Sequence, residues 1–597
     1  MDNSYESTTT SLTEYCPLLD KSPAPLMNNR DTQRNLRASI FNCAVVSILF
    51  TELCERLTFY GITGNLVYFA TRSDHLNMSS TGASVLAYVF QGTCFTLPIL
   101  GGWLADTRAG KFSMIWFSVV IYLLGALLLP FGSIARNDNN GEKSQWAAND
   151  VTTNPIFMKV FYITGLFLVA FGTGGMKANV SLFGAQQVSY GGPAAIEAFF
   201  RWFYWFTNIG AFLAFTFVVY IQQNVSFFYG NLIPAFPLIL ALIIFLNGKW
   251  TYVRYPPHGN VITDTLSIMK EAIKKSRRPS ISSVFLNHWL DRAKLCFGGS
   301  YSSWEVEDVK KVCRLLPIFG SFIFYWTVYA QMYTSMVYQG KNMDIQINGH
   351  DIPIASLNVF NTLSILVLIP IIDNLVYPLL AKFEICPSQL QRIGFGMIIA
   401  TGSMVCAGGL EWVRVKQCCM YQDRPGEHNE NGTQVANIKI FYQVPQYTLI
   451  GLSEIFTSVT GMELTYTEAP QSLQGVMMGV FLLTLGLGNF AGAALLGIVN
   501  GITEAVSGVE GKWYPDQNYV NKSPHLAYYF FLLAGLMFLN FIVYVFVALS
   551  FKKKKESVSR SNGVVNKYGK PPRLFRKNES DDGCWTSVRP AANNSAL

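Results

Sequence analysis

Charged side chains are scarce in this chain of 597 residues: they make up 14% of it, whereas apolar residues make up 50%. Soluble domains carry about 25% charged residues, so a soluble globular protein of this size is not expected. The eleven cysteines show no spacing typical of metal or redox sites. No nucleophile with a nearby base, and no set of metal ligands, stands at a usable spacing. We therefore expect no enzyme, no metal site, no cofactor and no nucleic-acid partner.

Apolar segments of about 20 residues recur along almost the whole chain, and each is long enough to cross a bilayer as a helix. The first 38 residues are polar, so a cleavable signal peptide is not expected. The pattern predicts an all-α membrane protein with twelve transmembrane helices in two six-helix halves. The predicted spans are 40–69, 82–104, 112–134, 157–184, 198–220, 232–253, 309–338, 354–380, 392–413, 438–464, 473–499 and 524–550.

These spans divide the chain into five predicted parts. They are a disordered cytosolic arm at 1–38, an N-terminal six-helix bundle at 39–253, a cytosolic linker at 254–306, a C-terminal bundle at 307–550 and a basic tail at 551–597. The arm, the linker and the tail carry the basic clusters, so the positive-inside rule places both termini in the cytosol. Sequons for glycosylation fall in loops on the opposite side, at Asn77, Asn224, Asn431 and Asn521.

The cytosolic arm contains Glu14 four positions ahead of Leu18 and Leu19. This spacing is that of an acidic dileucine sorting signal, which endolysosomal coat adaptors read. It predicts a multi-pass protein of the lysosome and endosome. The alternative is a chance match, because such short motifs occur often.

The first span carries the most unusual stretch, since Glu52, Glu55 and Arg56 stand in the middle of it. A charge at the bilayer centre costs roughly 2.5–3.5 kcal/mol on insertion scales. Their spacing, with Tyr60 one turn further, puts these side chains on one helix face. We expect this face to line an internal site; the alternative is an ion pair that only holds the fold together.

Two other buried charges stand in apolar spans. Lys177 follows a run of glycines in the fourth span and lies too deep to reach the interface easily. A phosphate loop is rejected because no Ser or Thr follows this lysine and no strand precedes the glycines. We expect Lys177 to meet the carboxylates of the first span. Glu454 is the one strongly buried carboxylate predicted in the second half, and such a residue marks a substrate or ion path more often than a structural pair.

The segment from Glu52 to Gly61 resembles the E-x-x-E-R-F-x-Y-Y-G signature of the proton-coupled oligopeptide transporters, with Leu57 and Phe59 replacing two aromatics. The segments 101–111, 174–179 and 203–210 resemble other signatures of that family. The segments 59–67, 325–332 and 443–456 are similar to its endolysosomal peptide/histidine branch.

The resemblance implies a major facilitator fold with alternating access and a central site shared by the two halves. It implies that Arg56 and Lys177 hold the substrate carboxylate and that Glu454 holds the α-amino group. Other substrate-binding residues implied are Tyr60, Asn179, Trp326, Gln331 and Asn361. Glu52, Glu55 and Glu454 would couple transport to a proton. Charges that resemble a gate are Asp106 and Arg108, in the loop between spans two and three, and Asp373 in span eight.

The chain also departs from the plasma-membrane peptide carriers of animals. Tyr88 stands where those carriers have a proton-linked His, and Phe95 stands where they have a neighbouring Tyr. Thr63 stands where many peptide carriers have a second Arg, and Ala330 stands where the animal carriers have an acidic residue in span seven. Proton coupling cannot therefore be copied directly from those carriers.

The leading hypothesis is a proton-coupled symporter that moves histidine and di- or tripeptides from the acidic endolysosomal lumen to the cytosol. A carboxylate of the first span would take a proton from the lumen and so loosen its hold on Lys177. Its partners would be protons, these substrates, membrane lipid and sorting adaptors. One alternative is a carrier of another amino acid or small metabolite on the same fold. Another is a transporter-like scaffold or receptor whose cytosolic arms recruit a signalling adaptor.

Overall fold

The computed structural model describes residues 42–134 except 73, 155–256, 261–276, 288–384 except 348, 387–420, 436–469, 474–516, 525–568, 575–577 and 585–587. The described chain forms two compact units. The larger unit lies within residues 1–258, 322–462 and 479–541, and the smaller within 259–321, 463–478 and 542–597. The predicted division into halves, linker and tail is a different one and stays a prediction.

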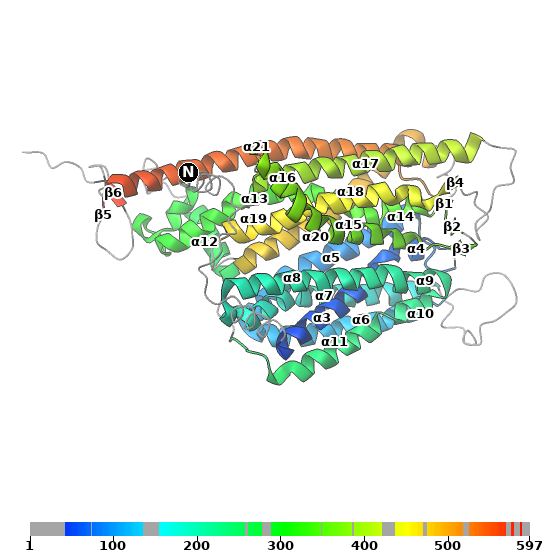
Figure 1. The fold of residues 1–597 in the computed structure, drawn as a ribbon, viewed down its shortest axis with the longest axis horizontal. Helices are drawn as coiled ribbons and strands as arrows, with labels where there is room; N and C mark the ends of the chain where they lie inside the picture. Colours follow the sequence, from blue (N-terminus) through cyan, green and yellow to red (C-terminus); the bar gives the residue numbers. More distant parts are fainter. Residues whose placement is uncertain are drawn as a thin grey trace, which may run out of the picture. The chain divides into compact units, whose positions relative to one another are not determined.

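Helices dominate both parts of the sequence that were predicted as six-helix halves (Figure 1). The first half contains α3 (Cys43–Gly64), α4 (Leu66–Thr71), α5 (Ser80–Leu104), α6 (Lys111–Phe131), α7 (Pro155–Val188), α8 (Gly192–Leu213), α9 (Val219–Asn224), α10 (Phe227–Leu232) and α11 (Ala235–Asn247). The second half contains α13 (Ser303–Tyr329), α14 (Ser335–Gly340), α15 (Asn358–Ile371), α16 (Tyr377–Lys382), α17 (Gln389–Met420), α18 (Val444–Glu454), α19 (Thr460–Glu468), α20 (Gln474–Ser507) and α21 (His525–Tyr568).

Within the described residues, ten helical segments are long and apolar enough to cross a membrane. They confirm a multi-pass α-helical membrane protein. The other two predicted spans, 40–69 and 438–464, contain helices from Cys43 and from Val444 onward, but these are too polar to stand out by composition. The first contains Glu52, Glu55 and Arg56, and the second is rich in hydroxyl and amide side chains. The full count of twelve therefore stays a prediction.

Glycines set the closest helix crossings in the first half. A Cβ added at Gly101 of α5 would lie 2.7 Å from the Gly175 Cα of α7, and one at Gly210 of α8 would lie 2.6 Å from the Leu53 oxygen of α3. Only glycine allows backbones to approach this closely. α3 packs against α7, α8 and α11 (Figure 1). Lys177 of α7 lies over the ring of Phe59 of α3.

Hydrogen bonds between the two halves gather at the end of the larger unit where α3 and α4 finish. Lys341 Nζ donates to Thr71 Oγ1 at 2.9 Å, and Thr334 Oγ1 donates to the Tyr88 hydroxyl at 2.9 Å. Further bonds join Ser84 to Tyr514, Asn500 to Thr81, and Ile354 to Gln223. These bonds hold the two halves together at this end.

In the described parts of the chain the strands are short and form three pairs. β1 (Met343–Asp344) pairs in parallel with β4 (Ala436–Lys439). β2 (Gln346–Ile347) pairs antiparallel with β3 (His350–Asp351), and β5 (Phe575–Lys577) pairs antiparallel with β6 (Trp585–Ser587).

The smaller unit contains α12 (Val261–Ser276), which packs against the 3₁₀ turn Trp289–Ala293. Asp291 in this turn binds Lys310 at 2.6 Å and Lys294 at 2.9 Å, and both lysines also bind Glu307 at 2.6 Å. Burial would raise the pKa of Asp291, but the two lysines outweigh it and hold this pKa below its ordinary value. This four-residue cluster fixes the turn to the start of α13.

Candidate substrate site

The charged face of α3 forms one compact cluster. The Nε atom of Arg56 lies 2.7 Å from Glu52 Oε1 and 2.8 Å from Glu55 Oε2. Both glutamates are buried, with 3% and 0% of their surface exposed, and the Tyr60 hydroxyl also interacts with the guanidinium. The spacing argument for one shared face is therefore confirmed. Arg56 neutralises part of the negative charge of both carboxylates.

Lys177 lies beside this cluster but does not pair with it. Its ammonium nitrogen lies 3.5 Å from the centre of the Phe59 ring and 3.8 Å from the centre of the Phe95 ring. Among the described residues it has no hydrogen-bond partner, and no ion pair within 4.0 Å joins it to either glutamate. The expectation that Lys177 meets these carboxylates was wrong for direct contact. Arg56 lies closer to both, although neither oxygen of Glu55 has a hydrogen-bond partner among the described residues.

Glu454 ends α18 and is followed at once by the π-helical turn Ile455–Val459. Such turns widen a helix and are frequent at functional sites. The Asn361 amide of α15 and the Tyr329 hydroxyl of α13 approach its carboxylate. Its buried Oε2 atom has no hydrogen-bond partner among the described residues. The second half thus offers a carboxylate oxygen that can still accept a bond.

Aromatic rings connect the cation cluster of the first half to this carboxylate. The Tyr60 ring lies 5.4 Å from Phe215, Phe215 lies 6.4 Å from Tyr333, and Tyr333 lies 6.2 Å from Tyr329. Tyr60 also lies within electrostatic range of both Arg56 and Glu454. Tyr60, which lies beside Arg56 in the first half, is therefore also near Glu454 of the second half.

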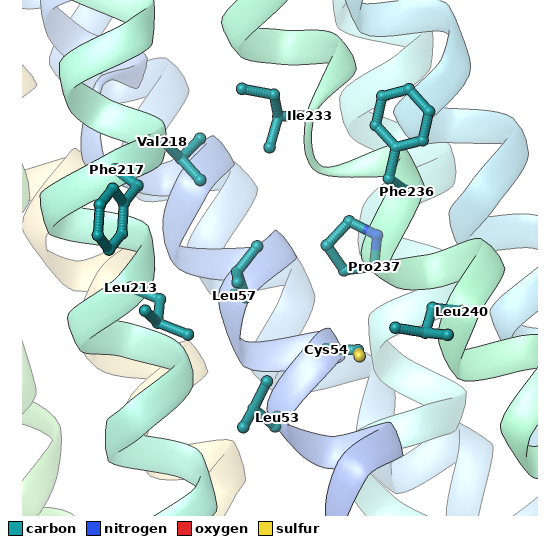
Figure 2. Close-up of a pocket in the computed structure, with 10 residues that line it drawn as sticks. All are labelled: Leu53, Cys54, Leu57, Leu213, Phe217, Val218, Ile233, Phe236, Pro237 and Leu240. Atoms are coloured by element: carbon teal, nitrogen blue, oxygen red, sulfur yellow. The ribbon is translucent and has the colours of Figure 1, made fainter.

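A separate groove of about 430 Å³ lies against a different face of α3 (Figure 2). Leu53, Cys54 and Leu57 of α3 line it together with apolar side chains from 213–218 and 233–240. Its lining has no charged group, so it cannot balance the charges of a zwitterion. The region between Arg56 and Glu454 is the better candidate for a polar substrate.

Comparison with known proteins now decides the family. Residues 112–513 match the sequence model described as POT family, which is more than half of the chain. The chain belongs to the POT family. It is thus a member of the proton-dependent oligopeptide transporters, and the resemblance seen in its motifs is confirmed.

Relatives of this POT protein align along most of their length. Protein NRT1/PTR FAMILY 8.1 of Arabidopsis thaliana is 32% identical, over 90% of this chain and 96% of its own. Solute carrier family 15 member 3 of Rattus norvegicus is 30% identical, over 87% of this chain and 94% of its own. The crystal structure of the POT family transporter PepTSo has a TM-score of 0.68 at 22% identity and covers 85% of this chain and 98% of its own. This last likeness supports the major facilitator fold alone.

Three other residues expected at the site of this POT protein are buried, and their polar groups are engaged elsewhere except for Asn179 Oδ1, which has no hydrogen-bond partner among the described residues. Asn179 Nδ2 donates to the backbone oxygens of Gly175 and Gly101, which favours a role in packing α7 on α5. Trp326 Nε1 donates to Thr484 Oγ1 at 3.1 Å. Gln331 binds Ser335 and the Thr327 oxygen within its own span. Their roles toward substrate stay predictions.

The predicted gate charges are described only in part. Asp106 binds Lys111 across the turn after α5 at 2.8 Å, and Arg108 is exposed. The backbone of Asp373 lies in the π-helical turn Ile372–Val376, and its side chain lies outside the description. The arrangement around Asp106 is that of a charged turn, and the gate function stays a prediction.

Only some of the predicted glycosylation and sorting residues lie in the described part of the chain. Asn77 and Asn224 are exposed, as a glycan requires, and Asn224 Nδ2 also donates to the Asp351 oxygen at 3.1 Å. Glu14, Leu18, Leu19, Asn431 and Asn521 lie outside the described residues. Glycosylation and sorting therefore stay predictions.

Sequence reasoning missed a second buried ion pair, in α17. Arg414 and Glu411 are both 0% exposed and form a bidentate pair, at 2.9 Å from Nε and 2.6 Å from Nη2. Gln339 of α14 donates to the same carboxylate at 3.0 Å. The spacing of three residues in an apolar span was the available signal. The pair links α14 to α17.

Proposed function

We propose that this POT protein is a proton-coupled symporter that moves histidine and di- or tripeptides from the endolysosomal lumen to the cytosol. The observation that carries the proposal is a pair of opposite charges, one from each half, whose buried polar atoms have no direct partner among the described residues. Lys177 has no anionic partner within 4.0 Å among the described residues, and Glu454 keeps a buried oxygen without a hydrogen bond.

A zwitterion would satisfy both groups at once. Its carboxylate would bind Lys177, and its α-amino group would bind Glu454 with Asn361 beside it. Charge-assisted hydrogen bonds are about twice as strong as neutral ones, and they offset the desolvation of the ligand's ends. The rings of Tyr60, Phe215 and Tyr333 would cover the part of the ligand between these ends. This set of contacts suits free amino acids and short peptides.

Proton coupling would act through Arg56. Glu52 and Glu55 both hold its guanidinium in this structure. A proton taken up by either carboxylate would weaken that hold and leave Arg56 free to join Lys177 on the substrate carboxylate. Substrate and proton would then favour the same state, as coupling requires.

The proton gradient would drive transport from the acidic lumen to the cytosol, and the gate indicates which side this state would be closed to. Bonds such as Lys341 to Thr71 and Thr334 to Tyr88 close the end where α4 finishes. The positive-inside rule assigns that end to the lumen, so the structure would represent the state closed to the lumen. Because the Tyr88 bond joins two hydroxyls, this contact does not need a titrating imidazole.

Dipeptides with one end blocked test the assignment of Glu454. We expect an N-acetylated dipeptide to compete poorly with a labelled free dipeptide for wild-type protein in proteoliposomes. Glu454→Gln should weaken binding of the free dipeptide and largely abolish its advantage over the N-acetylated one, because the amino group loses its anionic partner. Glu504→Gln, which changes a carboxylate with 45% exposure, is the matched control. Unchanged discrimination in Glu454→Gln would rule out this role.

A further inference from the structure

Lys177 contacts the faces of two phenyl rings. The lysine is 9% exposed, and its ammonium lies over the faces of Phe59 of α3 and Phe95 of α5, at 3.5 and 3.8 Å from their centres. Both distances are well within the range of about 6 Å at which a ring face attracts a cation. Two such contacts on one buried cation are therefore a site and not incidental packing.

The charged groups around Lys177 explain why the rings are needed. The titratable groups that act on it are Arg56, Glu55, Glu52 and Cys94, and Tyr122 of α6 lies within range of Glu55. Arg56 repels the ammonium and holds both carboxylates. A buried ammonium without an anion in contact is costly. Glu55 and Glu52 attract it from beyond 4.0 Å, and the two ring faces contact it directly.

We propose that Phe59 and Phe95 are positioning residues that form an aromatic cradle. The cradle holds the charged Lys177 in the substrate-free transporter and releases it to the carboxylate of an incoming substrate. The first part stands on the contacts alone, and the second rests on the proposed function. Neither ring carries a hydroxyl, so neither offers the ammonium a hydrogen bond that would have to be broken when substrate arrives.

The neighbouring rings hold the cradle in shape. Phe59 meets Phe95 edge to face at 5.8 Å and 83°, and it stacks on Phe90 at 6.4 Å and 24°. The guanidinium of Arg56 lies 6.0 Å from the Phe59 centre, so one ring serves both cations. A movement of Arg56 away from its glutamates would change the field on the same ring that holds Lys177. The cradle thereby connects the two cations assigned to the substrate carboxylate.

Graded fluorination tests the cradle without any substrate. Phe95 is replaced by mono-, di- and trifluorophenylalanine in the full-length protein, since fluorine weakens the ring's attraction for a cation while nearly keeping its shape. Each variant is made with Lys177 and with Lys177→Met, and unfolding is measured in detergent. We expect a stepwise loss that reaches about 30-fold in the unfolding equilibrium constant with Lys177 and is absent with Lys177→Met. The same series at Phe183, a buried ring of α7 away from the lysine, should show no such dependence.

Equal losses with and without Lys177 would show packing alone and overturn the cradle. The unfolding measurement tests the cradle even if the protein transports a different substrate. In uptake assays, which rest on the proposed function, the fluorinated variants should lower the KM, because the substrate carboxylate competes with weaker rings. Phe95→Tyr, which keeps the ring face, should retain the dependence on Lys177. A raised KM beside an intact cycle would overturn only the release step.

Discussion

His75 should make this protein less stable in acid. The side chain lies in the loop between α4 and α5, is 8% exposed, and packs on the rings of Phe69 at 4.8 Å and Phe227 at 5.1 Å. Burial lowers the pKa of His75 from 6.5 to about 4, against the opposing effect of Asp74, whose carboxylate lies 3.7 Å from Nε2. The folded protein therefore holds this imidazole neutral at pH values where the unfolded chain protonates it.

The sign and the size follow from linkage. Above the unfolded pKa of 6.5 the imidazole is neutral in both states and has no effect on stability. As the pH falls from 6.5 toward 4, the unfolded chain gains a proton that the folded protein does not, so stability falls. Two pKa values of 6.5 and about 4 give a loss of about 2 kcal/mol near pH 5.

Unfolding in detergent at neutral pH and near pH 5 measures this loss. His75→Gln and His75→Phe should each lose about 2 kcal/mol less on acidification than the wild type does. Asp74→Asn is the control: it removes the carboxylate that favours the imidazolium and lowers the folded pKa further, but it should leave the loss near pH 5 almost unchanged, because the folded imidazole is already neutral there. An acid loss in both His75 variants equal to that of the wild type would refute the reasoning.

Two further predictions concern packing. Glu411→Gln should destabilise the protein by about 3–5 kcal/mol in thermal unfolding, because it removes the buried carboxylate that accepts two hydrogen bonds from Arg414; a change below about 1 kcal/mol would contradict this. Gly101→Ala should cost about 1–3 kcal/mol, since the new Cβ would meet the Gly175 backbone at 2.7 Å. Gly479→Ala, whose Cβ would lie 3.8 Å from its nearest neighbour, should not lower the stability. Equal losses of stability in Gly101→Ala and Gly479→Ala would contradict a close crossing of α5 and α7 at Gly101.

The spacing of residues close together in the sequence predicted several features of the structure. The positions of Glu52, Glu55 and Arg56 predicted one shared helix face, and the structure brings the three charges together. Helical spacing fixes such neighbours because it depends on the backbone alone. The apolar segments likewise located the helices, although α3 and α18 are too polar to identify by composition.

The sequence did not predict which side chains from distant segments contact each other. The position of Lys177 within an apolar span predicted that it is buried. It did not predict that Arg56 would lie closer to both carboxylates, or that the lysine would contact Phe59 and Phe95. Asn179 was expected to face substrate, yet its amide bonds backbone oxygens of α5 and α7. Such outcomes depend on how helices rotate against each other, which hydrophobic periodicity constrains only coarsely.

The most direct test of the central claim is uptake of labelled histidine and a labelled dipeptide into proteoliposomes with an imposed pH gradient. Wild-type protein is compared with Glu454→Ala and Lys177→Ala, each checked for folding. The account predicts uptake that follows the proton gradient in the wild type, with each substrate competing against the other, and that is lost in both variants. Gradient-driven uptake that survives unchanged in either variant, or none in folded wild-type protein, would contradict it.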